Sequence, residues 1–427
     1  MTPERRTELE LPALLSDLYV ESAPSYRFDV LAQTSRMRQR PRWTFPERWL
    51  PMALVRRRAW APAFPMRPVL VAAALILLVL ALIVLQAATR APVPPPFGIA
   101  RNGEIVYAVD GEIYVRDTVD SPRRLLIGGP ERDWGPWFSR RGDRFIFFRE
   151  IAPETSDLYV AKADGSDVRR LGGPFMDIDT WDVTPDGTEA MIAGRAEHTG
   201  NWLLQFFPLD GGRSRVLSLP DSATWARFRP GGGSWLSFRS GSPDAAGTMY
   251  LVRTDGSDLR QLDIAIDGIG GGHDFTHGMD WSVDGSRFAF VSIDRDAGED
   301  GGLRIGIATV SPDGDVTSQQ PVEFDPTSDH ELNPVFLPGT DKLLFNTREG
   351  PVDYVSVGTP GLRGGTIIPA GSVSQGGIDY IISPDAQSAL VLNWGDRTTF
   401  IYDFATLTAR EVDLSPEDVS AFQRRAP

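Results

Sequence analysis

The residues with the clearest potential for chemistry are three histidines in the second half of the chain. His273 and His277 occur in GGHDFTHGMDW and His330 occurs in SDHELNPVF. Imidazole and carboxylate groups are common ligands of divalent metals. One interpretation is therefore a metal site; the other, which we prefer, is ordinary hydrogen bonding in Gly-rich loops, where His-x₃-His spacing does not fix ligand geometry. The nearby carboxylates of the metal interpretation are Asp274, Asp280 and Glu331.

The acidic loop DRDAGEDGG, from Asp294 to Gly302, is a second cluster of oxygen ligands of the kind that calcium takes. Its spacing departs from the EF-hand pattern, so we interpret it as a solvated loop. The fourth histidine, His198, is expected at the surface. We predict that the chain uses no cofactor.

Nucleophilic catalysis has little support in the sequence. The chain has no cysteine, which excludes disulfides, thiolate zinc sites and cysteine nucleophiles. It also contains no Gly-x-Ser-x-Gly elbow of the hydrolase type. We therefore predict no catalytic residue and a protein that is not an enzyme.

The elements that carry these residues repeat along the chain. KADGSDVRRL, from Lys162 to Leu171, returns as RTDGSDLRQL, from Arg253 to Leu262. An Asp-Gly turn between short apolar runs predicts a β-hairpin, because glycine adopts positive φ without steric cost. The two Asp-Gly pairs lie 255 − 164 = 91 residues apart, which is about twice a period near 45. Periods of this size are typical of propeller blades.

A second motif, an apolar residue followed by a turn and another strand, tests this period. Its anchors are spaced by 45, 45, 53, 55 and 46 residues, and they are Phe138, Val183, Phe228, Trp281, Phe336 and Ile382. Each unit predicts a four-stranded antiparallel blade, so the fold class is an all-β propeller. A shortened unit from Ala100 to Ile127 brings the count to seven blades, with six as the alternative. We expect an early strand near 97–101 to pair with the last blade and close the ring.

The stretches MDWSVDGSRFAFVS and DLYVAKADGSDVRRLGG resemble the TolB-type, WD40-like propeller family with its PD40 repeats. The resemblance covers about Phe97 to Leu414 and implies a propeller that binds its ligands at the central channel. Phe228 and Phe336 replace the tryptophan of that pattern. No hydrolase domain follows the repeats, in contrast to prolyl-oligopeptidase-like enzymes.

Charge divides the chain into a basic head and an acidic body. Residues 1–67 hold 12 Arg against 7 Asp+Glu, a net +5, whereas residues 91–427 hold 30 Lys+Arg against 50 Asp+Glu, a net −20. Such a body argues against nucleic acid as a partner. Between the two, residues 68–89 carry no charge, which predicts a transmembrane helix. The arginines before it place the head in the cytoplasm and the body outside a bacterial cell membrane.

These observations predict five segments. Residues 1–67 are a cytoplasmic helical segment, 68–89 the single transmembrane helix, 90–96 a stiff Pro-rich spacer, 97–416 the propeller and 417–427 a polar tail.

The head contains apolar stripes at helical spacing. TELELPALLSDLY begins with a Thr-x-x-Glu capping box, and fewer than 70 residues make a marginal core. The stripes therefore either bind a protein partner or pack as a helical hairpin. The predicted partner-binding residues are Leu11, Leu14, Leu15, Leu18, Tyr26, Phe28 and Leu31. Aromatic and basic side chains favour the membrane interface, and the predicted interface residues are Trp43, Phe45, Trp49, Arg56, Arg57, Arg58 and Arg67.

A helical head, one span and an outer propeller resemble the layout of bacterial transmembrane anti-sigma factors. The resemblance implies a membrane-anchored binding or sensing protein whose head engages a cytoplasmic regulator such as a sigma factor, while the propeller binds an envelope protein or glycan. The zinc-binding form of that head needs cysteines, which this chain lacks. Two alternatives stay open: a metal-dependent enzyme on envelope glycan or peptide, and a scaffold in an envelope complex.

Overall fold

The computed structural model of this chain describes the propeller and one helix before it. The described residues are 66–89, 94–197, 200–219, 221–231, 234–241, 247–266, 278–294, 302–322, 331–347, 352–357, 363–368, 378–393, 395–406, 408–416 and 421–426. The chain divides into two units, Met1–Arg90 and Ala91–Pro427. Each unit is described by itself.

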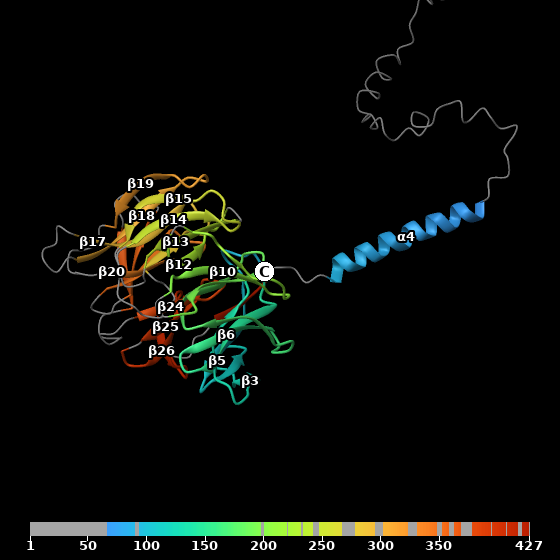
Figure 1. The fold of residues 1–427 in the computed structure, drawn as a ribbon, viewed down its shortest axis with the longest axis horizontal. Coiled ribbons are helices and arrows are strands. Elements are labelled where there is room, and N and C mark those ends of the chain that lie inside the picture. Colours follow the sequence, from blue (N-terminus) through green and yellow to red (C-terminus); the bar gives the residue numbers. More distant parts are fainter. Residues whose placement is uncertain are drawn as a thin grey trace, which may run out of the picture. The chain divides into compact units, whose positions relative to one another are not determined.

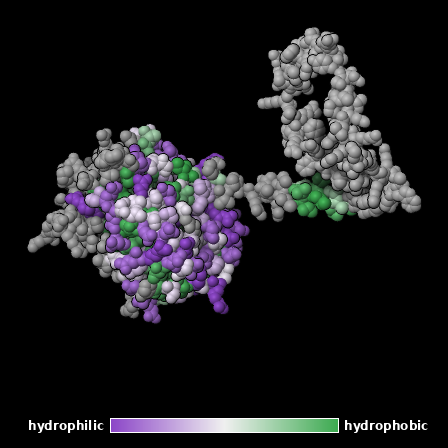
Figure 2. Space-filling model, turned by 90° about the horizontal axis from the view of Figure 1, so that it is seen from above, coloured by the Kyte–Doolittle hydropathy of each residue, from purple (hydrophilic) through white to green (hydrophobic). Residues whose placement is uncertain are grey.

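The first unit contains helix α4, Met66–Thr89. Its run of Ala and Leu is strongly helix-forming. The described side chains from Leu70 to Leu80 include eight large apolar ones that are more than half exposed, and they give the helix the green surface of Figure 2. In the part of the chain that the structure describes, no helix reaches the length and hydropathy that a membrane span needs. The transmembrane helix predicted at 68–89 is therefore not confirmed.

The second unit is a β-propeller of four-stranded antiparallel blades (Figure 1). The described strands form seven such sheets, which we number as blades 1 to 7. Blade 1 contains β28 (Ala421–Arg425), β1 (Arg101–Val109), β2 (Glu112–Arg116) and β3 (Arg124–Ile127). Blade 2 contains β4 (Asp133–Phe138), β5 (Arg144–Ala152), β6 (Thr155–Lys162) and β7 (Arg169–Phe175). Blade 3 contains β8 (Asp177–Val183), β9 (Glu189–Arg195), β10 (Leu203–Pro208) and β11 (Arg215–Val216).

The remaining blades follow in chain order. Blade 4 contains β12 (Ala223–Phe228), β13 (Trp235–Ser240), β14 (Gly247–Arg253) and β15 (Arg260–Ile266). Blade 5 contains β16 (Met279–Trp281), β17 (Arg287–Asp294), β18 (Gly302–Val310) and β19 (Val316–Pro321). Blade 6 contains β20 (Glu331–Phe336), β21 (Lys342–Thr347), β22 (Val352–Ser356) and β23 (Arg363–Ile368). Blade 7 contains β24 (Ile378–Ile382), β25 (Ser388–Asn393), β26 (Thr398–Asp403) and β27 (Thr408–Val412).

The repeated Asp-Gly motif forms the predicted hairpins between the two outer strands of blades 2 and 4. Asp164 accepts hydrogen bonds from the backbone N–H and the hydroxyl of Ser166 at 3.0 and 2.6 Å. Asp255 accepts the same pair from Ser257 at 2.9 and 2.7 Å. The side chain of each aspartate thus fixes the turn, as Asx turns do, and both motifs stand at the same place in their blades.

The core lies between the blades. Each of seven apolar clusters of the described residues joins the facing sheets of two neighbouring blades, and one of them joins blade 7 to blade 1. The six predicted anchors are the last residues of strands β4, β8, β12, β16, β20 and β24. Five of them are buried, which explains why an apolar residue recurs at this position.

The ring closes differently from the prediction. Strand β28 pairs with β1, with Arg101 opposite Arg425 and Val106 opposite Ala421. The last strand of the chain therefore completes the first blade, and the two chain regions meet where Figure 1 shows blue-green beside red. The prediction that an early strand joins the last blade is wrong, and residues 421–425 of the predicted polar tail form a strand. The repeat from Ala100 to Ile127 is short because the inner strand of blade 1 is β28, which lies more than 290 residues later in the sequence.

Candidate functional site

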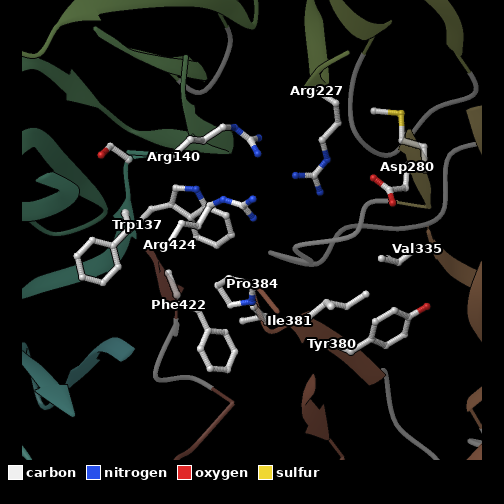
Figure 3. A pocket seen from close by; sticks show the side chains of 15 residues that line it. Trp137, Arg140, Arg227, Asp280, Val335, Tyr380, Ile381, Pro384, Phe422 and Arg424 are labelled. Carbon is white, nitrogen blue, oxygen red and sulfur yellow. The ribbon is translucent and has the colours of Figure 1, made fainter. Parts of the chain in front are cut away.

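The candidate site is a cavity of about 240 Å³ at the centre of the propeller. The inner strands of blades 1, 2, 4, 5, 6 and 7 supply its walls. Figure 3 shows the guanidinium groups of Arg140, Arg227 and Arg424 directed into this space, with the carboxylate of Asp280 facing Arg227. Aromatic side chains, among them Trp137, Tyr380 and Phe422, complete the lining.

β-Bulges in the inner strands direct several of these side chains into the cavity. Register shifts occur between Trp134 and Trp137 in β4, between Thr224 and Arg227 in β12, and between Leu332 and Val335 in β20. The residue that ends each bulge, namely Trp137, Arg227 or Val335, lines the cavity. A bulge re-aims a side chain and is common beside functional sites.

Two bulges contain a non-glycine residue at positive φ, and a neighbouring blade stabilises each of them. Trp225 has a φ of 52°, and its backbone N–H donates to Asp179 Oδ2 of blade 3 at 2.7 Å. Asn333 has a φ of 52°, and its carbonyl accepts the hydroxyl proton of Tyr380 in blade 7. A bulky residue in this region is strained. The neighbouring blade therefore holds the shape of the cavity wall.

Aspartates of the inner strands also connect neighbouring blades directly. Asp182 accepts from Trp137 Nε1 at 3.2 Å and from Arg140 Nη2 at 2.5 Å. Asp280 Oδ2 accepts from the backbone N–H of Phe336 at 2.8 Å. These links fix the positions of the inner strands of neighbouring blades relative to one another around the channel.

Burial changes the protonation of the groups that line the cavity. It raises the pKa of Asp280 to about 6, although the Phe336 N–H and the charge of Arg227 oppose the shift. Burial also lowers the pKa of Arg227, with Asp280 and Asp182 acting in the opposite direction. Such shifts mark sites where charge is held away from water.

The segment Pro94–Ala100, which we call the strap, is hydrogen-bonded to residues that line the cavity. Arg424 Nη2 donates to the carbonyls of Pro95 and Gly98 at 3.1 and 2.5 Å. Arg140 Nη1 donates to the carbonyl of Pro96 at 3.3 Å. The backbone N–H of Ala100, at the end of the strap, donates to the carbonyl of Pro384 at 2.7 Å. The strap therefore contacts three cavity-lining residues, from blades 1, 2 and 7.

The side chains of the strap extend these contacts to further blades. The guanidinium of Arg140 lies 4.5 Å from the centre of the Phe97 ring, and Phe97 packs on the cluster between blades 3 and 4. A Cβ on Gly98 would lie 3.1 Å from Val283 in blade 5. Pro95 and Pro96, assigned to a spacer in the sequence, are thus bound to the propeller.

Most of the predicted site residues lie outside the described part of the chain. This holds for the partner-binding residues 11–31, the interface residues 43–58 and the histidines at 198, 273, 277 and 330. Arg67 belongs to α4, but its side chain is not described. Among the described residues, no group of three or more His, Asp or Glu side chains could hold a metal ion. The metal interpretation thus stays a prediction.

The arginines of the cavity were not predicted from the sequence. Their positions relative to the anchors could have indicated part of the lining. The residue immediately before the anchor lines the cavity in five blades: Trp137, Arg227, Asp280, Val335 and Ile381. Successive side chains of a strand point to opposite faces, so the residue before an anchor points away from the anchor's side of the sheet. The anchors Phe138 and Ile382 also reach the lining. Of the five residues before an anchor, only Asp280 was among the candidates.

Comparison with known proteins supports the fold. No protein-family model matches the chain, and no curated protein matches it. A prolyl endopeptidase structure matches with 16% identity and a TM-score of 0.52, covering 75% of this chain and 51% of that chain. A functionally unknown protein from Desulfotomaculum acetoxidans matches with 13% identity and a TM-score of 0.52, covering 76% and 99%. TolB from Acinetobacter baumannii matches with 14% identity and a TM-score of 0.42, covering 75% and 66%.

At these identities the similarity concerns the fold alone. The chain spans 66% of the TolB chain and 51% of the prolyl endopeptidase chain, so the remainder of those proteins has no counterpart in the match. Peptidase propellers and proteins of other kinds both occur among the similar structures. In fold, the chain resembles TolB and other β-propellers of the PD40 type.

Proposed function

We propose that this protein is a binding module whose ligand site is the central channel, and that it is not an enzyme. The observation that carries the proposal is the composition of the cavity. Three guanidinium groups and several aromatic side chains converge on one space, held by bulges and by aspartates of neighbouring blades. A concave site with a few convergent polar groups is the usual form of a ligand site.

Blocking the cavity tests this proposal. Val335→Trp adds bulk to the cavity wall, whereas Val216→Trp places the same side chain on the outer strand β11, where Val216 is 53% exposed. Partners captured from the native host by the unaltered protein and by Val216→Trp, but not by Val335→Trp, would support the channel as the binding site. Equal capture by both variants would show binding on the outer surface and overturn the proposal.

We further propose that residues 68–89 attach the protein to a bacterial cell membrane, with the head in the cytoplasm and the propeller outside. The support is the absence of charge from 68 to 89 and the exposed apolar side chains of α4. Leu75→Glu together with Leu78→Glu should release the protein from sedimented membranes, because charges within a span are costly. Retention of this variant in carbonate-washed membranes would contradict the attachment.

The head would then carry the sensing role, by binding a cytoplasmic regulator such as a sigma factor. This proposal rests on the apolar stripe that includes Leu14 and Leu18. Leu14→Asp with Leu18→Asp should abolish capture of a cytoplasmic partner, and Ser16→Asp with Ser22→Asp provides the charge-matched control. Equal capture by both pairs would leave the head without a sensing role.

A further inference from the structure

The cavity is positively charged inside an acidic body. Among the described residues, its lining contains Arg140, Arg227 and Arg424 and one carboxylate, that of Asp280, whereas residues 91–427 as a whole have a net charge of −20. Low-dielectric walls around charges of one sign concentrate the field and attract ions of the opposite sign. The site is therefore suited to an anion that the rest of the surface would repel.

Arg424 differs from Arg140 in its partners. Among the described residues, no carboxylate forms an ion pair with it, and the acceptors of its Nη2 are the neutral carbonyls of Pro95 and Gly98. Burial and, secondarily, the charge of Arg140 lower its pKa to about 10. Arg140, in contrast, is paired with Asp182 through Nη2 and gives only Nη1 to the strap.

We propose that a carboxylate group of the channel ligand binds between Arg424 and Arg140 and displaces the strap carbonyls from them. The proposal rests on the proposed function of the channel and adds the chemical class of the ligand. A carboxylate adds the attraction of a full opposite charge and a bidentate geometry, which a neutral carbonyl does not offer to a guanidinium. Arg424 Nη2 and Arg140 Nη1 would donate to the ligand carboxylate in place of the strap carbonyls. Arg140 would retain its ion pair with Asp182.

The strap would leave its place as the carboxylate enters. Its bonds to Arg424 and Arg140 are the ones that the ligand takes over, and the stacking of Phe97 on Arg140 depends on the same guanidinium. The bond from the Ala100 N–H to Pro384 marks the end of the strap. Exchange of this amide with solvent therefore reports whether the strap has moved.

The test is calorimetric titration of the full chain at low salt with two probes, succinate and an acetylated, amidated pentaglutamate peptide. Arg424→Gln should weaken binding of the accepted probe by about tenfold or more, because hydrogen bonds to charged groups are lost. Arg425→Gln is the matched control, since Arg425 is exposed and bonds to Gln423. Succinate binding indicates a small carboxylate as ligand, and binding of the peptide alone indicates an acidic peptide.

A second measurement keeps the test valid if Arg424→Gln folds poorly. Phe97→Ala removes the ring from Arg140 and should raise the affinity of the accepted probe, while saturation with the probe should speed exchange of the Ala100 amide. Failure of both probes to bind, or equal affinity of Arg424→Gln and Arg425→Gln, would overturn the carboxylate site. The proposed function would survive that result if Val335→Trp still abolished partner capture.

Discussion

At the scale of single residues, arginines that reach into the next blade hold the propeller together. Arg229 is 5% exposed, and it donates to the carbonyls of Gly285, Val310 and Ser311 at 2.8, 3.1 and 2.7 Å. All three carbonyls belong to blade 5, whereas Arg229 follows the inner strand of blade 4. Buried carbonyls left without a donor would each cost free energy.

Arg229→Ala should lower the free energy of unfolding by roughly 2 to 4 kcal/mol, because three carbonyl acceptors, two of them in buried residues, lose their donor together. Urea unfolding followed by tryptophan fluorescence measures this change. Arg260→Ala is the control from the same blade: Arg260 is 39% exposed and lies 3.7 Å from Asp315, so its loss should cost less than about 1 kcal/mol. Equal losses in the two variants would contradict a structural role for Arg229.

Asp280 makes the stability depend on pH in a predictable direction. Burial raises its pKa to about 6, above the value near 3.9 of an unfolded chain. The folded state thus binds the extra proton, and this contribution to stability is complete below pH 3.9 and is lost as the pH rises through 6.

Relative to Asp280→Asn, the unaltered protein should therefore lose stability between about pH 4 and pH 7, by an amount on the order of 2 kcal/mol. Asparagine can still accept the N–H of Phe336, so the variant is a fair reference. Urea unfolding of both proteins at the two pH values measures the difference. Parallel pH profiles would show that Asp280 titrates normally.

At the scale of elements, strand β28 closes the ring, because it supplies the inner strand of blade 1. It covers the inner edge of β1, and Gln423 Nε2 donates to the buried carbonyl of Gly142 in blade 2 at 2.6 Å. Without it, the strand edge of blade 1 would be exposed to water and to other chains.

Removal of residues 421–427 should lower the unfolding temperature by roughly 10 °C or more and cause aggregation, because the loss affects two blade interfaces at once. Removal of 426 and 427 alone leaves β28 intact and should change little. Calorimetry with light scattering compares the two truncated chains. Similar unfolding temperatures would mean that the ring does not need its closing strand.

The elements that the sequence predicts well are those with local signals. Phe138, Val183 and Trp281 end inner strands as expected, because an apolar side chain between blades recurs with every blade. The 45-residue period also reappears as contact: Trp137 and Asp182, which are 45 residues apart, bond across neighbouring blades. Because successive repeats form successive blades of the ring, residues one period apart in the sequence lie in neighbouring blades.

The cavity and the ring closure depend instead on contacts between distant residues. Arg424 reaches Pro95 and Gly98 across more than 320 positions, and no local pattern encodes such a pair. The bulge at Trp225 escapes prediction too, since tryptophan does not favour positive φ and Asp179 of another blade stabilises it. Sequence reasoning therefore identified the blades but not the channel wall.

At the scale of the whole molecule, the two units Met1–Arg90 and Ala91–Pro427 are separately compact. The propeller has its core between its own blades, and its strap begins at Pro94. A chain of residues 91–427 should therefore fold alone and unfold within about 2 °C of the full protein, since a domain with its own core is independently stable. Calorimetry of both chains measures this, and a much lower temperature for the shorter one would show that the first unit stabilises the propeller.

The position of β28 has a consequence for how the protein is made. A ribosome releases Arg101 to Val109 more than 300 residues before Ala421, the start of the strand that covers their edge. During synthesis, blade 1 thus lacks its inner strand until Ala421–Arg425 have left the ribosome, and the ring can close only after that. A stop codon that removes residues 421–425 would therefore leave blade 1 open even when the other six blades are complete.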